Sequence, residues 1–312
     1  MVADGYWDFA VRQARGESPT YDRLTTAIAD DDELLDLIAT LPEPKRQPNL
    51  LLGVVRLLGG PVDDPVAFHD FVAANWERVA AEILARATQT NETGRSALLM
   101  PVLASLPQPL ALIELGASAG LNLYPDRYAY RYNDHTIGTG TPLLDCTVTG
   151  DLPLPDALPT VVWRAGCDRN PLDVTDPADR AWLDALIWPE HTDRRDRLHA
   201  AAETARTDPP HLIRADLLDA LPELIAQAPE GATVVVFHSA MLYQVPQPDR
   251  DRFLALIREL PVHWISIEAP GAVPFDDLPP APANLAHNVL ALDGRPLAWT
   301  HGHGRSLTWF AN

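Results

Sequence analysis

One stretch of the chain combines an apolar run, a single acid and a turn of small residues. Leu110–Leu115 has the apolar character of a buried strand, and Glu114 lies near its end. Gly116, Ser118 and Gly120 follow at alternate positions, and a helix is expected after them. A strand, a glycine-rich turn and a helix together present backbone N–H groups and a helix N-terminus to a nucleotide-type ligand. The spacing therefore predicts a ligand-binding loop.

This loop has two chemical interpretations. Glu114-x-Gly116-x-Ser118-x-Gly120 resembles the first motif of class I S-adenosylmethionine (SAM)-dependent methyltransferases, with serine in place of the middle glycine. Gly116-x-Ser118-x-Gly120 is also the nucleophile-elbow pattern of α/β-hydrolases. The turn follows the first predicted strand, and no His-Gly-Gly pattern for an oxyanion hole precedes it. The cofactor loop is therefore favoured, and a structural turn without a ligand stays open as an alternative.

The methyltransferase resemblance implies a role for each loop residue. Glu114 would hold the loop backbone or meet the charged amino-acid end of SAM. Gly116, Gly120 and Asn122 would line the cofactor. Ser118 adds a side chain where the cofactor backbone usually passes, which is a departure from the methyltransferase pattern.

Two acids after later strands are candidate contacts for the rest of the cofactor. Asp168 follows the predicted strand 160–164, and nucleotide-binding folds place an acid for ribose hydroxyls at the end of their second strand. Asp216 follows the third predicted strand, in a segment that resembles the one from which methyltransferases contact adenine. A cap of a turn or helix explains each acid equally well. The long interval between Glu114 and Asp168 predicts that residues 122–159 are an insertion.

The catalytic candidates lie at the ends of the fourth and fifth predicted strands. His238 ends the fourth, at the carboxyl edge where open α/β sheets bind ligands. Its near-neutral titration suits a general base, with a satisfied structural histidine as the alternative. Ser239 and Tyr243 follow His238 closely, and Glu268 ends the fifth strand on the same edge.

The predicted substrate contacts are polar residues from separate loops: Asn91, Glu92, Arg127, Arg164 and His301. The loop with Asn91 and Glu92 is interpreted as a lid, or alternatively as an interhelical turn. The planar guanidinium groups of Arg127 and Arg164 are suited to bind an anionic group of the substrate. Structural salt bridges explain the two arginines equally well. His301 forms a His-x-His pair without an identifiable third ligand, so no metal site is predicted.

Composition limits the class of protein. A formal charge of −19 over 312 residues argues against nucleic acid and anionic membranes as partners. Lys45 is the only lysine among 24 basic residues. A P-loop or a Schiff-base mechanism, which would need a lysine at another position, is therefore not expected. Cys146 and Cys167 are too few for a disulfide framework and are expected as buried thiols. No apolar run approaches the ~20 residues of a membrane span, so a soluble, cytoplasmic protein is expected.

The elements that must position these residues change in character along the chain. Residues 1–106 are predicted to form a helical N-terminal cap region, and 107–312 a methyltransferase-like domain. The predicted strands are 110–115, 160–164, 211–214, 233–238, 262–268, 288–292, 297–300 and 306–310. They indicate an α/β fold with a doubly wound, mostly parallel Rossmann-like sheet of methyltransferase type and antiparallel C-terminal strands.

Several further segments resemble a single bacterial family. The matching stretches are Gln47-Pro48-Asn49-Leu50, Thr90-Asn91-Glu92, Glu114-x-Gly116-x-Ser118-x-Gly120-Leu121-Asn122, Asp126-Arg127-Tyr128, Arg164-x-Gly166-x-Asp168-x-x-Pro171-x-Asp173, Trp188-Pro189, Phe237-His238-Ser239 and His301-Gly302. These stretches occur in the same order along most of the chain as in the family catalogued as domain of unknown function 2332, which the chain therefore resembles. The resemblance implies one unit that includes the helical part, and it supplies no activity. It also implies that serine is usual in the glycine turn.

The leading hypothesis is a SAM-dependent methyltransferase-like enzyme that acts on a small molecule with an anionic group. One alternative is a cofactor-independent lyase, hydrolase or transferase that uses Ser118 and His238. Another is a non-enzymatic ligand-sensing or partner protein whose interface lies in residues 1–106.

Overall fold

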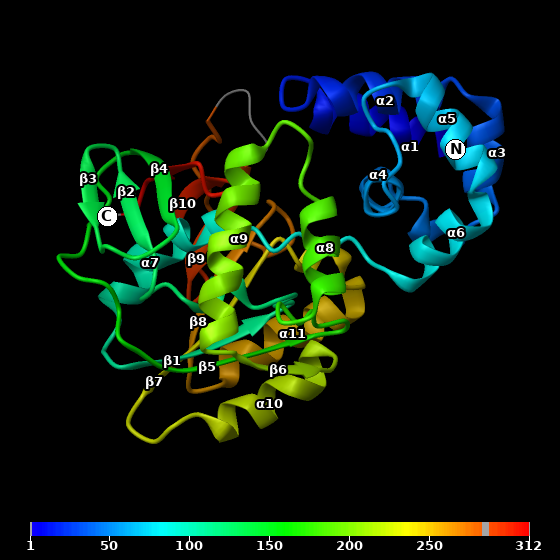
Figure 1. The fold of residues 1–312 in the computed structure, drawn as a ribbon. Coiled ribbons are helices and arrows are strands. Elements are labelled where there is room, and N and C mark those ends of the chain that lie inside the picture. The colour runs from blue at the N-terminus through cyan, green and yellow to red at the C-terminus, as the bar shows by residue number, and fades with distance from the viewer. Residues whose placement is uncertain (1, 283–286, 312) are drawn as a thin grey trace. The chain divides into compact units, whose positions relative to one another are not determined.

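The computed structural model describes residues 2–282 and 287–311, which belong to two compact units (Figure 1). Unit 1 comprises Met1–Thr90 and Thr175–Asp196. Unit 2 comprises Asn91–Val174 and Arg197–Asn312.

Unit 1 is helical. Its helices are α1 (Val2–Phe9), α2 (Pro19–Ala29), α3 (Asp32–Ala39), α4 (Pro48–Leu57), α5 (Pro65–Ala74), α6 (Trp76–Ala85) and α8 (Pro177–Ala185), with a π-helical turn at Ala10–Ala14 and a 3₁₀ turn at Glu43–Lys45. Asp64 caps α5 by accepting the N–H groups of Val66 and Ala67, and Pro65 follows it. Proline fits the first turn of a helix because the N–H it lacks has no intrahelical partner there.

Unit 2 contains an 11-stranded sheet. The strands are β1 (Leu110–Leu115), β2 (Ala129–Tyr132), β3 (His135–Ile137), β4 (Leu143–Thr149), β5 (Val161–Asp168), β6 (His211–Arg214), β7 (Thr233–Ser239), β8 (His263–Glu268), β9 (His287–Leu292), β10 (Arg295–His301) and β11 (Ser306–Trp309). Their order is β3-β2-β4-β11-β10-β9-β8-β7-β1-β5-β6. All the predicted strands are present, and β2, β3 and β4 are additional strands inside the predicted insertion.

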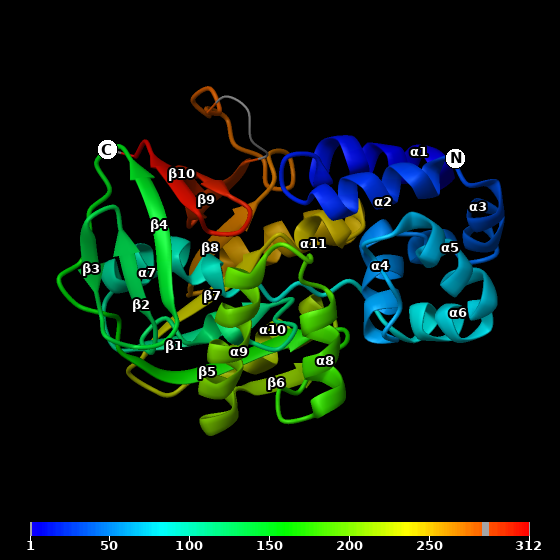
Figure 2. The ribbon, with the colours of Figure 1, turned by 45° about the horizontal axis from the view of Figure 1, so that its top comes forward.

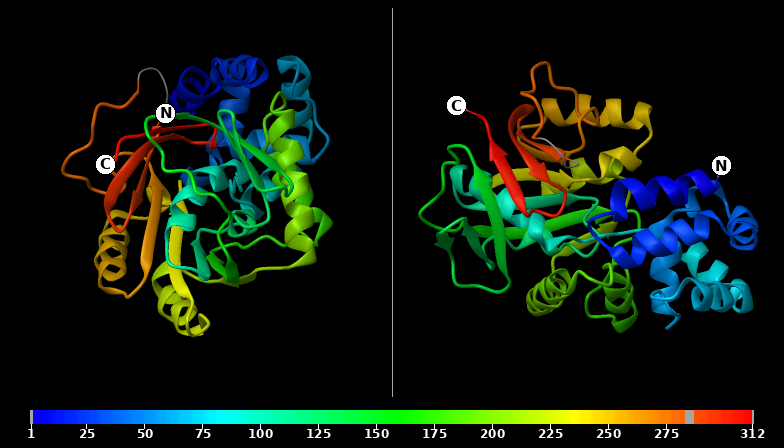
Figure 3. Two further views of the ribbon diagram at one scale, coloured as in Figure 1. Left: turned by 90° about the vertical axis from the view of Figure 1, so that its left-hand side faces the viewer. Right: turned by 90° about the horizontal axis from the view of Figure 1, so that it is seen from above.

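Five neighbouring strands of this sheet run parallel, in the order β6-β5-β1-β7-β8 (Figure 2). This order is typical of doubly wound sheets, with the reversal of winding between β1 and β7. Strands β9, β10 and β11 pair antiparallel, and β11 continues the sheet by pairing with β4 (Figure 3). The fold is thus a mixed α/β architecture with a large, open, mostly parallel sheet flanked by helices.

The helices of this unit are α7 (Ser96–Ser105), α10 (Leu217–Gln227) and α11 (Gln247–Glu259), and α9 (Thr192–Thr207) begins in unit 1 and ends in unit 2. Short 3₁₀ turns occur at Thr93–Arg95, Leu121–Leu123 and Leu242–Gln244. α10 and α11 pack on one face of the parallel strands, where their apolar residues share a core with Ile113 and Leu115 of β1 and Val236 of β7.

The division into units differs from the predicted boundary after residue 106. α7 belongs to unit 2, where the hydroxyl of Tyr132 on β2 donates to the carbonyl of Ala97. Its first eight residues are all buried, and a helix without a polar face is stable only inside a core. Conversely, 175–196 belongs to unit 1, where Trp182 of α8 packs against Gly53 of α4.

The helix expected after Gly120 is absent, which corrects the sequence prediction. Only the 3₁₀ turn Leu121–Leu123 follows. Pro125 disfavours a longer helix because proline lacks an N–H and restricts the residue before it. The carbonyls of Leu121 and Pro125 instead accept hydrogen bonds from the hydroxyls of Tyr128 and Tyr130.

Both cysteines lie in the interior of unit 2. Cys146 and Cys167 are buried and free, and burial raises the pKa of each thiol to about 12. They are therefore thiols at neutral pH, as expected. Among the described helices, none has the length and apolar character needed to cross a bilayer.

Candidate functional site

The turn after β1 has the left-handed backbone for which glycine is suited. φ is 68° at Gly116, 52° at Ser118 and 71° at Gly120. A Cβ atom on Gly116 would lie 2.5 Å from Cγ of Met241, so glycine is required for this close approach. Ser118 is the one residue of the three for which a positive φ is costly, by roughly 1 kcal/mol.

The backbone N–H groups of this turn bind the end of β5. The N–H groups of Gly116 and Ala117 donate to the carbonyl of Cys167 at 2.9 and 3.1 Å. The Ser118 N–H donates to Oδ2 of Asp168 at 2.8 Å. In loops that bind phosphate, such amides point at the ligand. Here the protein's own carbonyl and carboxylate occupy them, and no α-helix N-terminus follows.

Asp216, predicted near the adenine, caps a helix. Its Oδ1 accepts the N–H of Leu218 at 3.1 Å at the start of α10, and its Oδ2 accepts Nη2 of Arg169 at 2.7 Å. Partial burial alone would raise the pKa of Asp216, but the hydrogen bonds from Arg169 and Leu218 lower it. The helix-cap alternative is thus confirmed.

Glu114 is the most unusual acid in this unit. It lies on β1, and its side chain is 2% exposed. Its Oε1 accepts Nδ2 of Asn122 at 3.4 Å, whereas Oε2 has no hydrogen-bond partner among the described residues. Burial raises the pKa of Glu114 to about 8, against the opposing effects of Asn122 and the positive charge of Arg95. The carboxyl is therefore mostly protonated at neutral pH.

Asn122 and Arg95 connect Glu114 to neighbouring elements. Oδ1 of Asn122 accepts the hydroxyl of Ser96, the first residue of α7, at 2.9 Å. Arg95 donates from Nη1 to the carbonyl and hydroxyl oxygens of Ser239, at 3.1 and 3.2 Å. Its Nε donates to the carbonyl of Gly302 at 2.9 Å. Arg95 therefore joins the ends of β7 and β10 beside Glu114.

Glu92 belongs to the same carboxyl edge through the loop after β10. It is buried, and its Oε1 accepts the N–H of Gly94 at 3.0 Å. Oε2 lies 3.5 Å from Nδ1 of His303, and Nη2 of Arg197 lies 3.8 Å from Oε1. A carboxylate, an imidazole and a guanidinium thus meet next to the loop with Arg95.

The contact between these two loops requires glycine. A Cβ on Gly94 would lie 2.4 Å from the carbonyl oxygen of His303, and neither backbone has room to move aside easily. We expect Gly94→Ala to destabilise the fold by about 2 kcal/mol, as overpacking does in a well-packed interior. Urea unfolding measures the effect. Gly302→Ala is the matched control, because a Cβ there meets nothing within 4 Å. Equal stability of the two variants would contradict the tight contact.

His238 lies on the opposite face of the sheet from Glu114. Side chains alternate along a strand, and Leu115, the neighbour of Glu114, faces α10 and α11 together with Val236. His238 follows two residues after Val236 and packs edge-on against Phe253 of α11. The two strand ends are adjacent, yet the sheet itself separates their side chains.

Both ring nitrogens of His238 are used inside the protein. Nδ1 lies 2.7 Å from Oε1 of Glu268, and Nε2 accepts the indole N–H of Trp264 at 3.0 Å. The indole can only donate, so Nε2 is the acceptor and Nδ1 carries the proton. The ring has no exposed surface. A general base needs a lone pair within reach of substrate, so the structural-histidine alternative is the one that fits.

Glu268 and Tyr243, the other catalytic candidates near His238, differ in their surroundings. Oε1 of Glu268 accepts the N–H groups of Met241 and Leu242, at 3.0 and 3.2 Å, in addition to His238. Glu268 thereby holds the turn after β7. Tyr243 is 63% exposed, and its hydroxyl accepts only Nε2 of Gln244 among the described residues.

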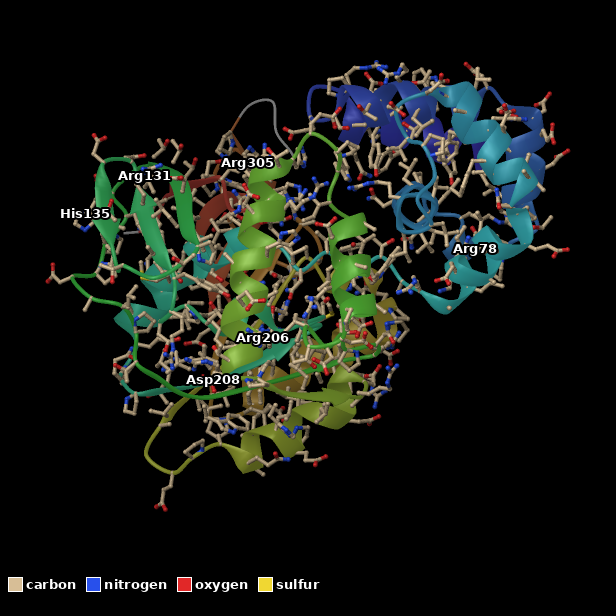
Figure 4. All side chains as sticks on the ribbon, in the orientation of Figure 1. Arg78, Arg131, His135, Arg206, Asp208 and Arg305 are labelled. Atoms are coloured by element: carbon tan, nitrogen blue, oxygen red, sulfur yellow. The ribbon has the colours of Figure 1, made fainter. Side chains whose placement is uncertain are left out.

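The two predicted substrate arginines form salt bridges. Arg164 is buried, and its Nη2 donates to both carboxylate oxygens of Asp126, at 2.8 and 2.7 Å. Its guanidinium also stacks over the ring of Tyr124. Arg127 is exposed and lies 3.7 Å from Asp208, which is labelled in Figure 4. The salt-bridge alternative therefore accounts for both arginines.

The last two predicted substrate residues also have structural contacts. Oδ1 of Asn91 accepts the N–H of Leu121 at 3.0 Å, directly after the glycine turn. Nδ1 of His301 accepts the N–H of His303 at 3.1 Å. Within residues 2–282 and 287–311, no cluster of three His, Cys, Asp or Glu side chains is arranged to hold a metal ion.

The structure thus brings together part of the predicted set. A hydrogen bond joins Glu114 and Asn122, and Arg95, whose positive charge acts on Glu114, binds Ser239. Ser96, Arg197 and His303 belong to the same region and were not among the predicted site residues. No local pattern could have found Ser96 or Arg197, because each meets its partner through contacts between distant elements.

Comparison with known proteins gives a family but no activity. No curated protein and no solved structure matches the chain. The family model described as "Uncharacterized protein conserved in bacteria (DUF2332)" matches residues 3–309. The chain therefore belongs to the bacterial DUF2332 family.

Proposed function

We propose that the protein is a SAM-dependent methyltransferase-like enzyme acting on a small molecule, with the cofactor at the turn Glu114–Gly120. The strand order carries the proposal. Five parallel strands run in the order β6-β5-β1-β7-β8, and the turn lies at the carboxyl end of β1, beside the reversal of winding. Ligands of open α/β sheets bind at this point.

The buried carboxyl of Glu114 supports a ligand with an ammonium group. Its Oε2 has no partner among the described residues, and buried polar atoms are normally satisfied. An ammonium group supplies the missing donor and stabilises the ionised carboxylate. The amino-acid end of SAM carries such a group, so the residues present fit the cofactor.

The occupied amides of the turn argue against a phosphate at the same place. Cys167 and Asp168 already accept the N–H groups of Gly116, Ala117 and Ser118. A dinucleotide would need these donors for its pyrophosphate. SAM has no phosphate. Asp168 lies at the carboxyl end of β5, where nucleotide-binding folds place an acid for ribose, so it remains our candidate for the ribose hydroxyls.

His303 replaces His238 in our proposal for the acid–base residue. Its side chain is 30% exposed, and it lies beside the buried Glu92 on the carboxyl edge. A carboxylate close to an imidazole is a common arrangement around a general base. His303 would accept the proton of a hydroxyl, amine or carboxyl acceptor.

Calorimetry with SAM and S-adenosylhomocysteine tests the proposed function. We expect binding to release a proton at pH 7, because Glu114, with its pKa raised to about 8, must ionise to meet the ammonium group. Affinity should therefore rise by up to tenfold per pH unit below pH 8, as long as the amino group of the ligand stays protonated. At fixed pH, the measured enthalpy should depend on the ionisation enthalpy of the buffer.

Absence of SAM binding would also be informative. A folded protein that binds neither compound would refute the SAM proposal. The raised pKa of Glu114 would then favour the cofactor-independent enzyme, in which a carboxyl that is protonated at neutral pH acts as a general acid.

A further inference from the structure

Ser118 is held in place from both sides of its backbone. Its N–H donates to Oδ2 of Asp168 at 2.8 Å, and its carbonyl accepts the N–H of Leu172 at 3.0 Å. The φ angle of 52° is thereby imposed on a residue with a Cβ atom. With the backbone fixed, only the hydroxyl is left to serve another partner.

The buried hydroxyl of Ser118 lowers the stability of the folded protein. The residue is 5% exposed, and Oγ has no hydrogen-bond partner among the described residues. A buried hydroxyl without a partner loses its hydration without compensation. Glycine would relieve both the missing hydrogen bond and the left-handed strain, as it does at Gly116 and Gly120. The side chain therefore opposes stability, which is typical of residues kept for binding or catalysis.

A nucleophilic role does not fit the surroundings. A serine nucleophile needs a base within hydrogen-bond reach. Both ring nitrogens of His238, the histidine that the hydrolase alternative would use, are engaged by Glu268 and Trp264, so neither is available to Ser118. Oγ therefore has the chemistry of a hydrogen-bond donor to a ligand.

We propose that the hydroxyl of Ser118 donates a hydrogen bond to the carboxylate at the amino-acid end of the ligand. This inference rests on the proposed function, which gives the ammonium of the same ligand group to Glu114. Glu114 lies near the end of β1 and Ser118 in the turn that follows it, and each has a buried oxygen without a partner in the described part of the chain. Oε2 of Glu114 can accept a hydrogen bond from an ammonium group, and Oγ of Ser118 can donate one to a carboxylate. Together they match the two charged groups of a zwitterionic amino acid.

Paired ligands and paired variants test the inference by calorimetry. SAM and decarboxylated SAM differ by the carboxylate, and Ser118→Ala and Ser118→Gly both lack the hydroxyl. We expect the wild type to prefer SAM by about tenfold or more, as for a hydrogen bond to a charged group. Both variants should lose most of this preference while they bind decarboxylated SAM as the wild type does.

Thermal unfolding of the same proteins supplies a second readout. Ser118→Gly should unfold about 2 °C higher than Ser118→Ala, because only glycine relieves the positive φ. A higher midpoint with reduced preference for SAM is the expected combination, since the strain would then be maintained for binding.

The possible failures are distinguishable. A wild type that binds neither ligand refutes the proposed function and this inference with it. A wild type that binds SAM, with variants that keep the full preference over decarboxylated SAM, overturns the role of Ser118 alone. Variants that lose affinity for both ligands equally would also overturn it, because the loss would then not involve the carboxylate.

Discussion

Replacing Glu114 by glutamine is expected to stabilise the folded protein. Burial raises the pKa of the Glu114 carboxyl to about 8, from an ordinary value of 4.5. Between these two pH values Glu114 is ionised in the unfolded chain and protonated in the folded chain, so folding takes up a proton. The free energy of unfolding therefore falls by about 1.4 kcal/mol per pH unit between the two pKa values, and it does not fall further at higher pH. Glutamine has no such dependence, and at pH 7 the gain is roughly 3 kcal/mol.

Urea unfolding at pH 5, 7 and 9 measures this gain. The difference between Glu114→Gln and the wild type should be small at pH 5, larger at pH 7 and largest at pH 9. Glu230→Gln, at an exposed turn, is the control and should follow the wild type at every pH. A Glu114→Gln variant whose stability parallels the wild type across the range would show that this carboxyl titrates normally.

The same substitution is expected to abolish SAM binding. Glutamine cannot supply the negative charge for an ammonium group, and loss of one partner of a buried charge pair costs about 2–5 kcal/mol, or at least 30-fold in affinity. A variant that is more stable and yet fails to bind would show that the site maintains an unfavourable buried acid for its ligand, a common compromise between stability and function.

Removing the carboxylate of Glu268 is expected to be strongly destabilising. Glu268→Ala leaves Nδ1–H of His238 and the N–H groups of Met241 and Leu242 without their acceptor in the interior. Loss of one partner from such a buried, charged hydrogen-bond network costs about 3–5 kcal/mol. Urea unfolding should show this loss, with Tyr243→Phe on the same turn as the unaffected control.

His238→Ala distinguishes the structural histidine from the predicted general base. A general base would lower turnover with the fold intact. We instead expect lost packing against Phe253 and Trp264, a lower unfolding midpoint, and unchanged SAM affinity in the fraction that stays folded. A His238→Ala protein as stable as the wild type would contradict the structural role.

The sequence by itself determined the positions of strands, of the glycine turn and of helix starts, because these depend on neighbouring residues. Leu110–Leu115 is a strand with the predicted bounds, because an apolar run between turn residues has few other stable conformations. Gly116 and Gly120 adopt positive φ, and Asp64 with Pro65 begins a helix. Each of these features depends on residues adjacent in the chain, so sequence alone was sufficient.

Only the tertiary structure decided which side chains share a site. Glu114 and His238 both end central strands, but alternation along paired strands sends them to opposite faces, and a register is needed to know this. Pro125 prevents the helix expected after Gly120, and the hydroxyls of Tyr128 and Tyr130 bind the carbonyls of Leu121 and Pro125. The raised pKa of Glu114 follows from burial by distant elements. Burial and pairing are properties of the assembled fold, because they depend on residues far apart in sequence.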